Sequence, residues 1–387
     1  MQRFVKAKIG TKKMKFRKRL LSMAAAVLMA GATMVAAVPA QAANVPAQGG
    51  TKTFNKYLVM DADANVPNAT SEFTITPGRA VDATADTPAI YAGIGTPMID
   101  SAIFTPGDTT TPGTPTNPDE SDKKYATKTV TVDFSSISFT APGIYRYIIT
   151  EKSSTDSAIT NDATTTRTLD AYVKYKTGSE TELEVTDYVL HEGSDNPNIA
   201  TKSAGFTNTY TTKNLTLTKN VTGNQGNRDK YFKFTVNITD AVAGTVYTVD
   251  LRNAETTPSV DGESKTNQSS LIVGEDGTVT AIYYLKDDQS IVIQGLTAAT
   301  NYKITESDYS KDGYTTTYTL DSESAESGYT FAEQTMGNAS HTVLFTNNKT
   351  GVVPTGILLE TAPYLILGVI VIAGVIALFV TRRRRVN

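Results

Sequence analysis

Two sets of lysine, glutamate and asparagine recur in the same order along this chain of 387 residues. In chain order they are Lys56, Glu151 and Asn208, then Lys219, Glu306 and Asn347. A neutral lysine amine held against an asparagine amide can condense with it and release ammonia, while a nearby glutamate moves the proton. These residue types therefore predict a self-formed amide cross-link in each half of the chain.

Strand parity predicts that all six residues face a core. Side chains two residues apart share a face of a strand, and Lys219 is in step with Leu217 and Val221. Each of the other five also shares its strand face with apolar neighbours: Lys56 with Phe54 and Leu58, Glu151 with Tyr147 and Ile149, Asn208 with Phe206 and Tyr210, Glu306 with Tyr302 and Ile304, and Asn347 with Val343 and Phe345. Burial would lower the pKa of a lysine and raise that of a glutamate, which favours a neutral, reactive pair.

Two simpler interpretations of the six residues stay open at this point. They could be strand-end residues whose polar tips reach solvent, or each lysine and glutamate could form a buried ion pair with no further chemistry. Buried lysine and glutamate are rare unless they are paired. The recurrence of both sets in one order favours the reactive interpretation.

The segments that must position these residues read as strands rich in Thr, Tyr, Val and Ile, separated by turn residues. They are Phe73–Thr76, Val130–Phe134, Ile144–Ile149, Ala171–Lys176, Tyr231–Ile238, Val246–Leu251, Ala281–Leu285, Ser290–Gln294, Tyr302–Thr305 and Thr342–Phe345. We expect an all-β fold of two tandem β-sandwich domains, residues 43–212 and 213–351. Lysine, glutamate and asparagine should lie on the first, penultimate and last strands. Thr105–Pro118 should be a solvated loop inserted in the first domain.

The N-terminus has the pattern of a secretory signal peptide, residues 1–42. Nine Lys or Arg residues and no acid occur in residues 1–20, and an apolar run from Leu20 to Val38 follows. Ala40 and Ala42 then provide the small residues of a cleavage site. We expect secretion and cleavage after Ala42. An uncleaved membrane anchor is the less favoured alternative.

The C-terminus, residues 352–387, combines a short motif, an apolar segment and a basic tail. The motif is Val353, Pro354, Thr355 and Gly356. Tyr364–Val380 is long enough to span a bilayer as a transmembrane helix, and Arg382–Arg385 would keep the tail on the cytoplasmic side. This order resembles the sorting signal of Gram-positive surface proteins, which a sortase cuts between Thr and Gly.

Composition excludes several classes of protein. The whole chain has 36 Lys+Arg and 39 Asp+Glu, but the two ends hold 13 of the basic and one of the acidic residues, so residues 43–355 have a net charge of −15. Such a surface repels nucleic acid and anionic membranes. The chain has no cysteine and two histidines, which excludes disulfides and leaves no pattern for a metal site, a cofactor or a hydrolase.

Together, these features resemble the major shaft pilins of the streptococcal T-antigen type, with two Ig-like domains of the CnaB type. The resemblance implies isopeptide bonds Lys56–Asn208 and Lys219–Asn347, promoted by Glu151 and Glu306. It also implies that a pilin-type sortase transfers the Thr355 carbonyl to a lysine of the next subunit. The Thr105–Pro118 insertion and the lack of a Tyr-Pro-Lys-Asn motif depart from the family pattern.

The lysine that accepts the next subunit should lie shortly before Asn208, by the same resemblance, which indicates Lys202. Regular strand parity would turn Lys202 inward with Phe206, whereas Gly205 interrupts a regular strand. Lys174 and Lys176 are the next candidates.

The function expected is that of a structural subunit, not an enzyme, of a covalent pilus on the wall of a Gram-positive bacterium. Its partners would be the sortase, identical subunits, minor pilins, peptidoglycan and, where adhesion is concerned, a host surface. Contact with a membrane would occur only through the C-terminal tail before sorting. A monomeric wall-anchored adhesin that binds a host matrix protein is the alternative, and a wall-anchored hydrolase has little support.

Overall fold

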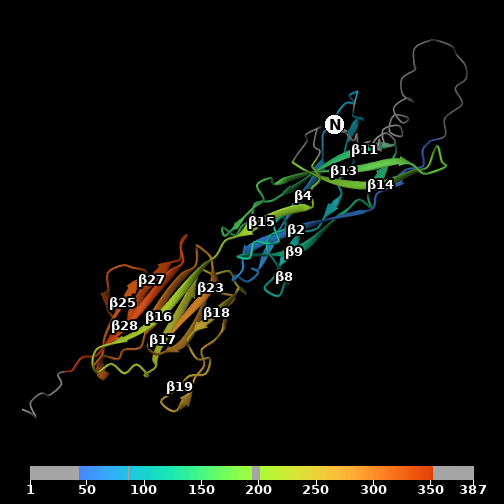
Figure 1. Cartoon of the computed structure of the whole chain (residues 1–387). Coiled ribbons are helices and arrows are strands. Elements are labelled where there is room, and N and C mark those ends of the chain that lie inside the picture. The colour runs from blue at the N-terminus through green and yellow to red at the C-terminus, as the bar shows by residue number, and fades with distance from the viewer. Residues whose placement is uncertain (1–42, 86, 194–200, 352–387) are drawn as a thin grey trace, which may run out of the picture. The chain divides into compact units, whose positions relative to one another are not determined.

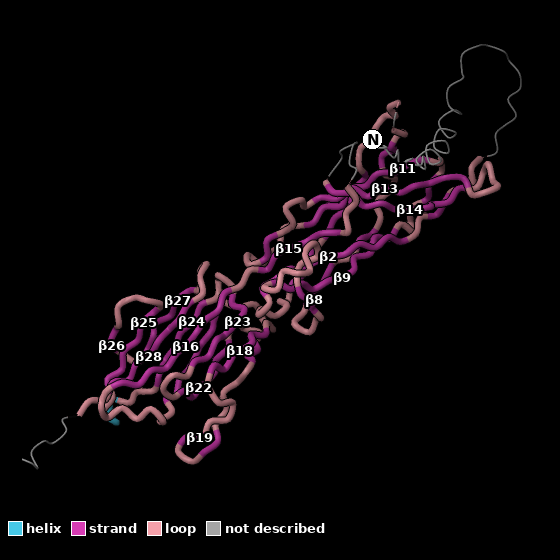
Figure 2. Tube along the Cα trace, viewed as in Figure 1, coloured by secondary structure: helices cyan, strands magenta, loops and turns pink. Residues whose placement is uncertain are grey.

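The computed structural model describes residues 43–85, 87–193 and 201–351. The chain divides into two compact units between Thr212 and Lys213, and each unit has its own apolar core. Figure 2 shows that both units consist of strands joined by loops. The expected signal peptide, sorting motif and transmembrane segment lie outside the described residues. In the part of the chain that is described, no helix has the length and hydrophobicity needed to cross a membrane.

The first domain is a sandwich of two main sheets. Its strands are β1 (Ala47–Gln48), β2 (Thr51–Asp61), β3 (Ala69–Ser71), β4 (Phe73–Pro77), β5 (Ile90–Ala92), β6 (Met98–Ile99), β7 (Ala102–Phe104), β8 (Thr110–Pro112), β9 (Lys123–Asp133), β10 (Ser138–Phe139), β11 (Gly143–Glu151), β12 (Ile159–Thr160), β13 (Thr166–Tyr175), β14 (Leu183–Glu192) and β15 (Gly205–Tyr210). One sheet has the order β12-β15-β2-β9-β6, and the other has the order β14-β13-β11-β4. Figure 1 shows β2 between β15 and β9.

The second domain repeats this plan. Its elements are β16 (Lys213–Thr222), β17 (Phe232–Thr239), β18 (Val246–Arg252), β19 (Ser259–Val260), β20 (Glu263–Ser264), β21 (Ser270–Ile272), β22 (Val279–Leu285), β23 (Ser290–Leu296), β24 (Asn301–Glu306), the 3₁₀ helix η1 (Ser310–Asp312), β25 (Thr315–Leu320), β26 (Glu326–Ser327), β27 (Thr330–Thr335) and β28 (His341–Asn348). The sheets have the orders β21-β18-β23-β16-β28-β25-β26 and β22-β17-β24-β27. The all-β fold class is confirmed.

The first and last long strands of each domain are hydrogen-bonded neighbours that run parallel, β2 with β15 and β16 with β28. Burial alternates along these strands: one face of β16 buries Leu215, Leu217 and Val221, and the other face is partly exposed. At the start of β15, Gly205 has φ of +148°, and a Cβ there would lie 1.7 Å from the Asn55 main-chain oxygen. Glycine is therefore required where β15 meets β2.

The glutamates are not on penultimate strands, so that expectation is wrong. After Glu151 on β11, the chain forms β12, β13 and β14 before β15. After Glu306 on β24, it forms η1 and β25 to β27 before β28. Both glutamate strands belong to the sheet opposite the lysine and asparagine strands. Parity indicates which face of a strand a residue occupies but not which sheet the strand joins.

The Thr105–Pro118 segment is partly ordered, which corrects the expectation of a plain loop. Most of its residues are exposed, as expected. However, β8 within it pairs antiparallel with β9, from Thr110 opposite Ala126 to Pro112 opposite Lys124. The insertion therefore extends the sheet that contains β2.

Candidate functional site

The first Lys–Glu–Asn set meets inside the first domain. Lys56 on β2 and Asn208 on β15 belong to one sheet, and Glu151 approaches them from β11 of the other. Lys56 Nζ lies 2.7 Å from Glu151 Oε1. Asn208 Nδ2 donates a hydrogen bond of 2.8 Å to the same oxygen. None of the three residues is more than 3% exposed, so one carboxylate oxygen joins the amine and the amide in a site closed to solvent.

The second set meets in the second domain in a looser arrangement. Lys219 Nζ lies 3.4 Å from Glu306 Oε1. It donates hydrogen bonds of 3.0 Å to the Asn220 carbonyl and 3.4 Å to the Phe345 carbonyl. Lys219, Glu306 and Asn347 are fully buried.

Both sites have the same backbone register. Lys56 lies opposite Phe206, and Asn208 is two residues further along β15. Lys219 likewise lies opposite Phe345, and Asn347 is two residues further along β28. Each glutamate lies opposite a phenylalanine on the neighbouring strand of its own sheet. Phe73 is opposite Glu151, and Phe234 is opposite Glu306. The two Lys–Glu–Asn sets that repeat in the sequence therefore occupy equivalent positions in the two domains.

Aromatic rings form the surroundings of the two lysines. Lys56 Nζ lies 5.9 Å from the centroid of the Phe206 ring, and Lys219 Nζ lies 4.4 Å from that of Phe232. Phe54, Phe73 and Phe206 contact one another beside the first lysine. Rings exclude water but stabilise a cation only weakly, so the charged amine is disfavoured here.

The pKa values respond to this burial. Burial lowers the pKa of Lys56 to about 8, although the charge of Glu151 opposes the shift. Burial also lowers the pKa of Lys219 to about 8 and raises the pKa of Glu306 to about 7, again against the attraction between the two charges. In the second site the two shifts narrow the gap between the pKa values of lysine and glutamate, and the lowered pKa of Lys56 acts in the same direction in the first. Moving the lysine proton away, which leaves a neutral amine as a nucleophile, therefore costs less free energy than it would in water.

The shifts predict a bell-shaped pH dependence for bond formation in the second domain. The reactive state holds one proton, on Glu306, beside a neutral Lys219. Below a pH of about 7 both groups are protonated and the amine is charged, and above about 8 no acid remains to protonate the leaving ammonia. The rate should be highest between these values. Refolding an unfolded, uncross-linked chain across this pH range, with ammonia loss followed by mass, would test this; a rate that rises steadily through pH 8 would contradict it.

Solvent exposure excludes one of the simpler interpretations. None of the six residues extends its polar end to the surface, since the least buried of them is 3% exposed. A buried ion pair without chemistry would not require an asparagine amide at the same carboxylate oxygen, as found in the first domain.

The expected acceptor Lys202 is exposed at the surface of the first domain. Residues 201–204 precede β15, and Lys202 forms an isolated bridge with His191. The parity argument that turned Lys202 inward is therefore wrong, because the regular strand begins only at Gly205. Lys174 and Lys176 are also exposed but lie 3.7 Å and 3.3 Å from carboxylates of the adjoining strand and turn.

Two further residues near the first site could not be predicted from the sequence. The main-chain N–H of Asp162 donates to Asn208 Oδ1 at 2.9 Å, and Arg167 holds the Asp162 carboxylate. A main-chain donor in a loop has no residue-type signature, so no pattern could have revealed it.

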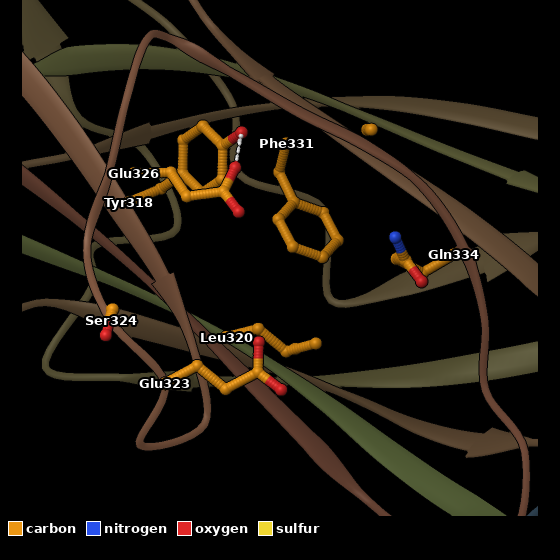
Figure 3. A pocket seen from close by; sticks show the side chains of 8 residues that line it. Tyr318, Leu320, Glu323, Ser324, Glu326, Phe331 and Gln334 are labelled. Atoms are coloured by element: carbon orange, nitrogen blue, oxygen red, sulfur yellow. Dashed lines mark hydrogen bonds between the residues drawn. The ribbon is translucent and has the colours of Figure 1, made fainter.

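A surface hollow in the second domain is separate from both sites. Figure 3 shows Phe331 and Leu320 at its wall and the hydrogen bond of 2.7 Å from the Tyr318 hydroxyl to Glu326. The hollow shares no residue with either Lys–Glu–Asn set. Among the residues that the structure describes, no group of three or more His, Cys, Asp or Glu could hold a metal ion.

Comparisons with known proteins identify relatives of this chain. A protein-family model described as a Spy0128-like isopeptide containing domain matches residues 101–211, and a domain of unknown function matches residues 213–349. A pilin of Streptococcus pyogenes serotype M1 is 28% identical over 379 residues, which cover 96% of this chain and 99% of that one. The chain is a homologue of the streptococcal pilins. The resemblance predicted from the sequence is thereby confirmed.

Solved pilin structures agree in fold. The major pilin from Streptococcus pyogenes has a TM-score of 0.52 at 23% identity, over 79% of this chain and all of that one. The T3.2 major pilin from the same species has a TM-score of 0.50 at 23% identity, over 78% of this chain and all of that one. These structures support two Ig-like sandwiches, and the pilin homology supports a structural rather than an enzymatic protein.

Proposed function

We propose that this pilin homologue is the shaft subunit of a covalent surface pilus, and that each of its domains closes its own isopeptide bond. Lys56 would join Asn208 with Glu151 as promoter, and Lys219 would join Asn347 with Glu306. The observation that carries the proposal is the shared carboxylate oxygen in the first domain, 2.7 Å from the amine and 2.8 Å from the amide nitrogen.

The position of the bonds suits a protein that bears tension. Each bond links the first long strand of its domain to the last, and these strands are parallel neighbours. A force that enters through β2 and leaves through β15 would pass through the amide and bypass the intervening chain. Because the chain has no cysteine, the amides would serve where secreted proteins often use disulfides, and an amide cannot be reduced.

Polymerisation needs a donor and an acceptor. The donor is Thr355, which lies outside the described residues; a pilin-type sortase would hold its carbonyl as a thioester and transfer it to an amine of the next subunit. Lys202 is the acceptor we favour, because it is exposed and, within the described ranges, has no carboxylate within ion-pair distance. Head-to-tail transfer gives an open chain without closure. Minor pilins and peptidoglycan would complete the assembly at the cell wall.

Replacing the acceptor should abolish the polymer. Lys202→Arg keeps the positive charge but removes the primary amine, so a Gram-positive host that supplies the sortase should yield a single monomer band on denaturing gels of wall extracts. The wild-type chain should yield a ladder of high mass. Lys174→Arg and Lys176→Arg are matched controls and should leave the ladder unchanged.

The gel patterns distinguish the proposed acceptor and the proposed shaft role from their alternatives. A ladder that persists in Lys202→Arg would refute this acceptor. A single band from the wild-type chain would refute the shaft role and favour a monomeric wall-anchored adhesin.

A further inference from the structure

The loop of residues 161–165, between β12 and β13, touches the reacting amide of the first site. The main-chain N–H of Asp162 donates a hydrogen bond of 2.9 Å to Asn208 Oδ1. At the other end of the same amide, Nδ2 donates to Glu151. The Asn208 amide is therefore held at its oxygen and at its nitrogen by two different elements.

The Asp162 carboxylate fixes this loop to β15. Its Oδ2 accepts hydrogen bonds of 2.8 Å from the Thr207 N–H and from Arg167 Nη2. Its Oδ1 accepts one of 2.9 Å from the Thr164 N–H. Because Thr207 is the residue before Asn208, the loop is tied to the strand directly beside the amide that it contacts.

Arg167 in turn is anchored on three sides. Its side chain is 5% exposed, and Nε donates to the Gly205 carbonyl at 3.0 Å. Its guanidinium lies 4.5 Å from the centroid of the Phe206 ring. A buried arginine with this many partners has little freedom, so the orientation of the Asp162 N–H is set before any reaction begins.

We propose that the main-chain N–H of Asp162 is an oxyanion donor for closure of the first isopeptide bond, and that Arg167 is its positioning residue. The inference rests on the proposed Lys56–Asn208 bond. Neutral Lys56 Nζ attacks Asn208 Cγ, and the electron pair of the carbonyl moves to Oδ1, where the Asp162 N–H meets the developing charge. Glu151, which holds the proton that the lysine gave up, delivers it to Nδ2 and takes a second proton from Nζ. The Cγ–Nδ2 bond then breaks and ammonia leaves. The side-chain amide of Asn208 has been replaced by an amide between Lys56 Nζ and Asn208 Cγ.

The geometry meets the requirement for such a donor. An oxyanion donor must lie about 2.7–3.1 Å from the oxygen that gains charge, and the Asp162 N–H lies 2.9 Å from it. The donor acts in a buried site, where water cannot screen it. Removing one such donor costs about 100-fold to 1,000-fold in rate in acyl-transfer enzymes.

The second site lacks this feature. In the described part of the second domain, no main-chain N–H donates to the oxygen of the Asn347 amide. The proposed donor is thus specific to the first domain, and the second bond of the same molecule provides an internal reference.

An amide-to-ester substitution at position 162 tests the donor alone, because it removes the N–H and keeps the aspartate side chain. Residues 43–355 would be assembled unfolded with the ester at 162, refolded by dilution, and sampled by mass spectrometry of fragments from each domain. We expect the first bond to form about 100-fold more slowly, with the second unchanged. An ester at Thr164 is the matched control, since it removes a hydrogen bond of the same loop without touching Asn208.

Stability measurements separate catalysis from folding. In a Lys56→Met background, where no first bond can form but Asn208 is kept, each ester removes one hydrogen bond, so the two esters should lower the melting temperature equally. Arg167→Gln should slow the first bond while the second is unaffected. Equal slowing by the two esters, or no slowing at 162, would overturn the inference. If the unmodified chain never loses ammonia from its first domain, the proposed function fails instead, so the two failures are distinguishable.

Discussion

Asn208→Ala should lower the free energy of unfolding of the first domain by about 5 kcal/mol, because it removes a cross-link that closes a loop of about 150 residues. For a domain of this size, we expect the melting temperature to fall by about 10–20 °C. The second domain keeps its own bond and should unfold as before. Differential scanning calorimetry of residues 43–351 would resolve the two transitions.

A neighbouring substitution controls for general disruption of β15. Thr209→Ala changes an exposed residue next to Asn208 and should shift the first transition by no more than a few degrees. If Asn208→Ala behaves like Thr209→Ala, no covalent bond stabilises the first domain.

Glu151→Gln should slow closure of the first bond by about 100-fold to 10,000-fold, since glutamine has the shape of glutamate but cannot carry the proton from lysine to ammonia. Newly made protein should therefore retain one ammonia that the wild type loses, relative to the mass of its own sequence, with the difference confined to fragments of the first domain. Glu306→Gln should have the corresponding effect in the second domain only. Mass spectrometry of proteolytic fragments measures both.

An exposed glutamate provides the control for this pair. Glu72 lies just before β4 and forms a surface ion pair with Lys152, so Glu72→Gln should leave both bonds complete. Completion of both bonds at the wild-type rate in Glu151→Gln and Glu306→Gln would contradict the role given to these carboxylates.

Strand parity in the sequence was enough to place the six residues of the two Lys–Glu–Asn sets in the cores, because each lies in a regular strand among apolar neighbours. The same reasoning failed for Lys202, where parity was extended past Gly205 into residues that form no regular strand. Burial follows from local pattern only as far as the strand itself extends.

The assembly of each site from two sheets could not be read from the sequence. Nothing local assigns β11 or β24 to the sheet opposite the lysine, since that choice depends on long-range pairing. The contact of the Asp162 N–H with Asn208 was equally hidden, because every residue except proline carries such a donor and only the folded loop aims this one.

The two proposed isopeptide bonds are tested most directly by the intact mass of residues 43–355 purified without sortase. Each Lys–Asn bond releases one ammonia, so we expect a mass two ammonia units below that of the sequence, together with branched peptides that join Lys56 to Asn208 and Lys219 to Asn347. The full sequence mass, with no branched peptides, would contradict both bonds.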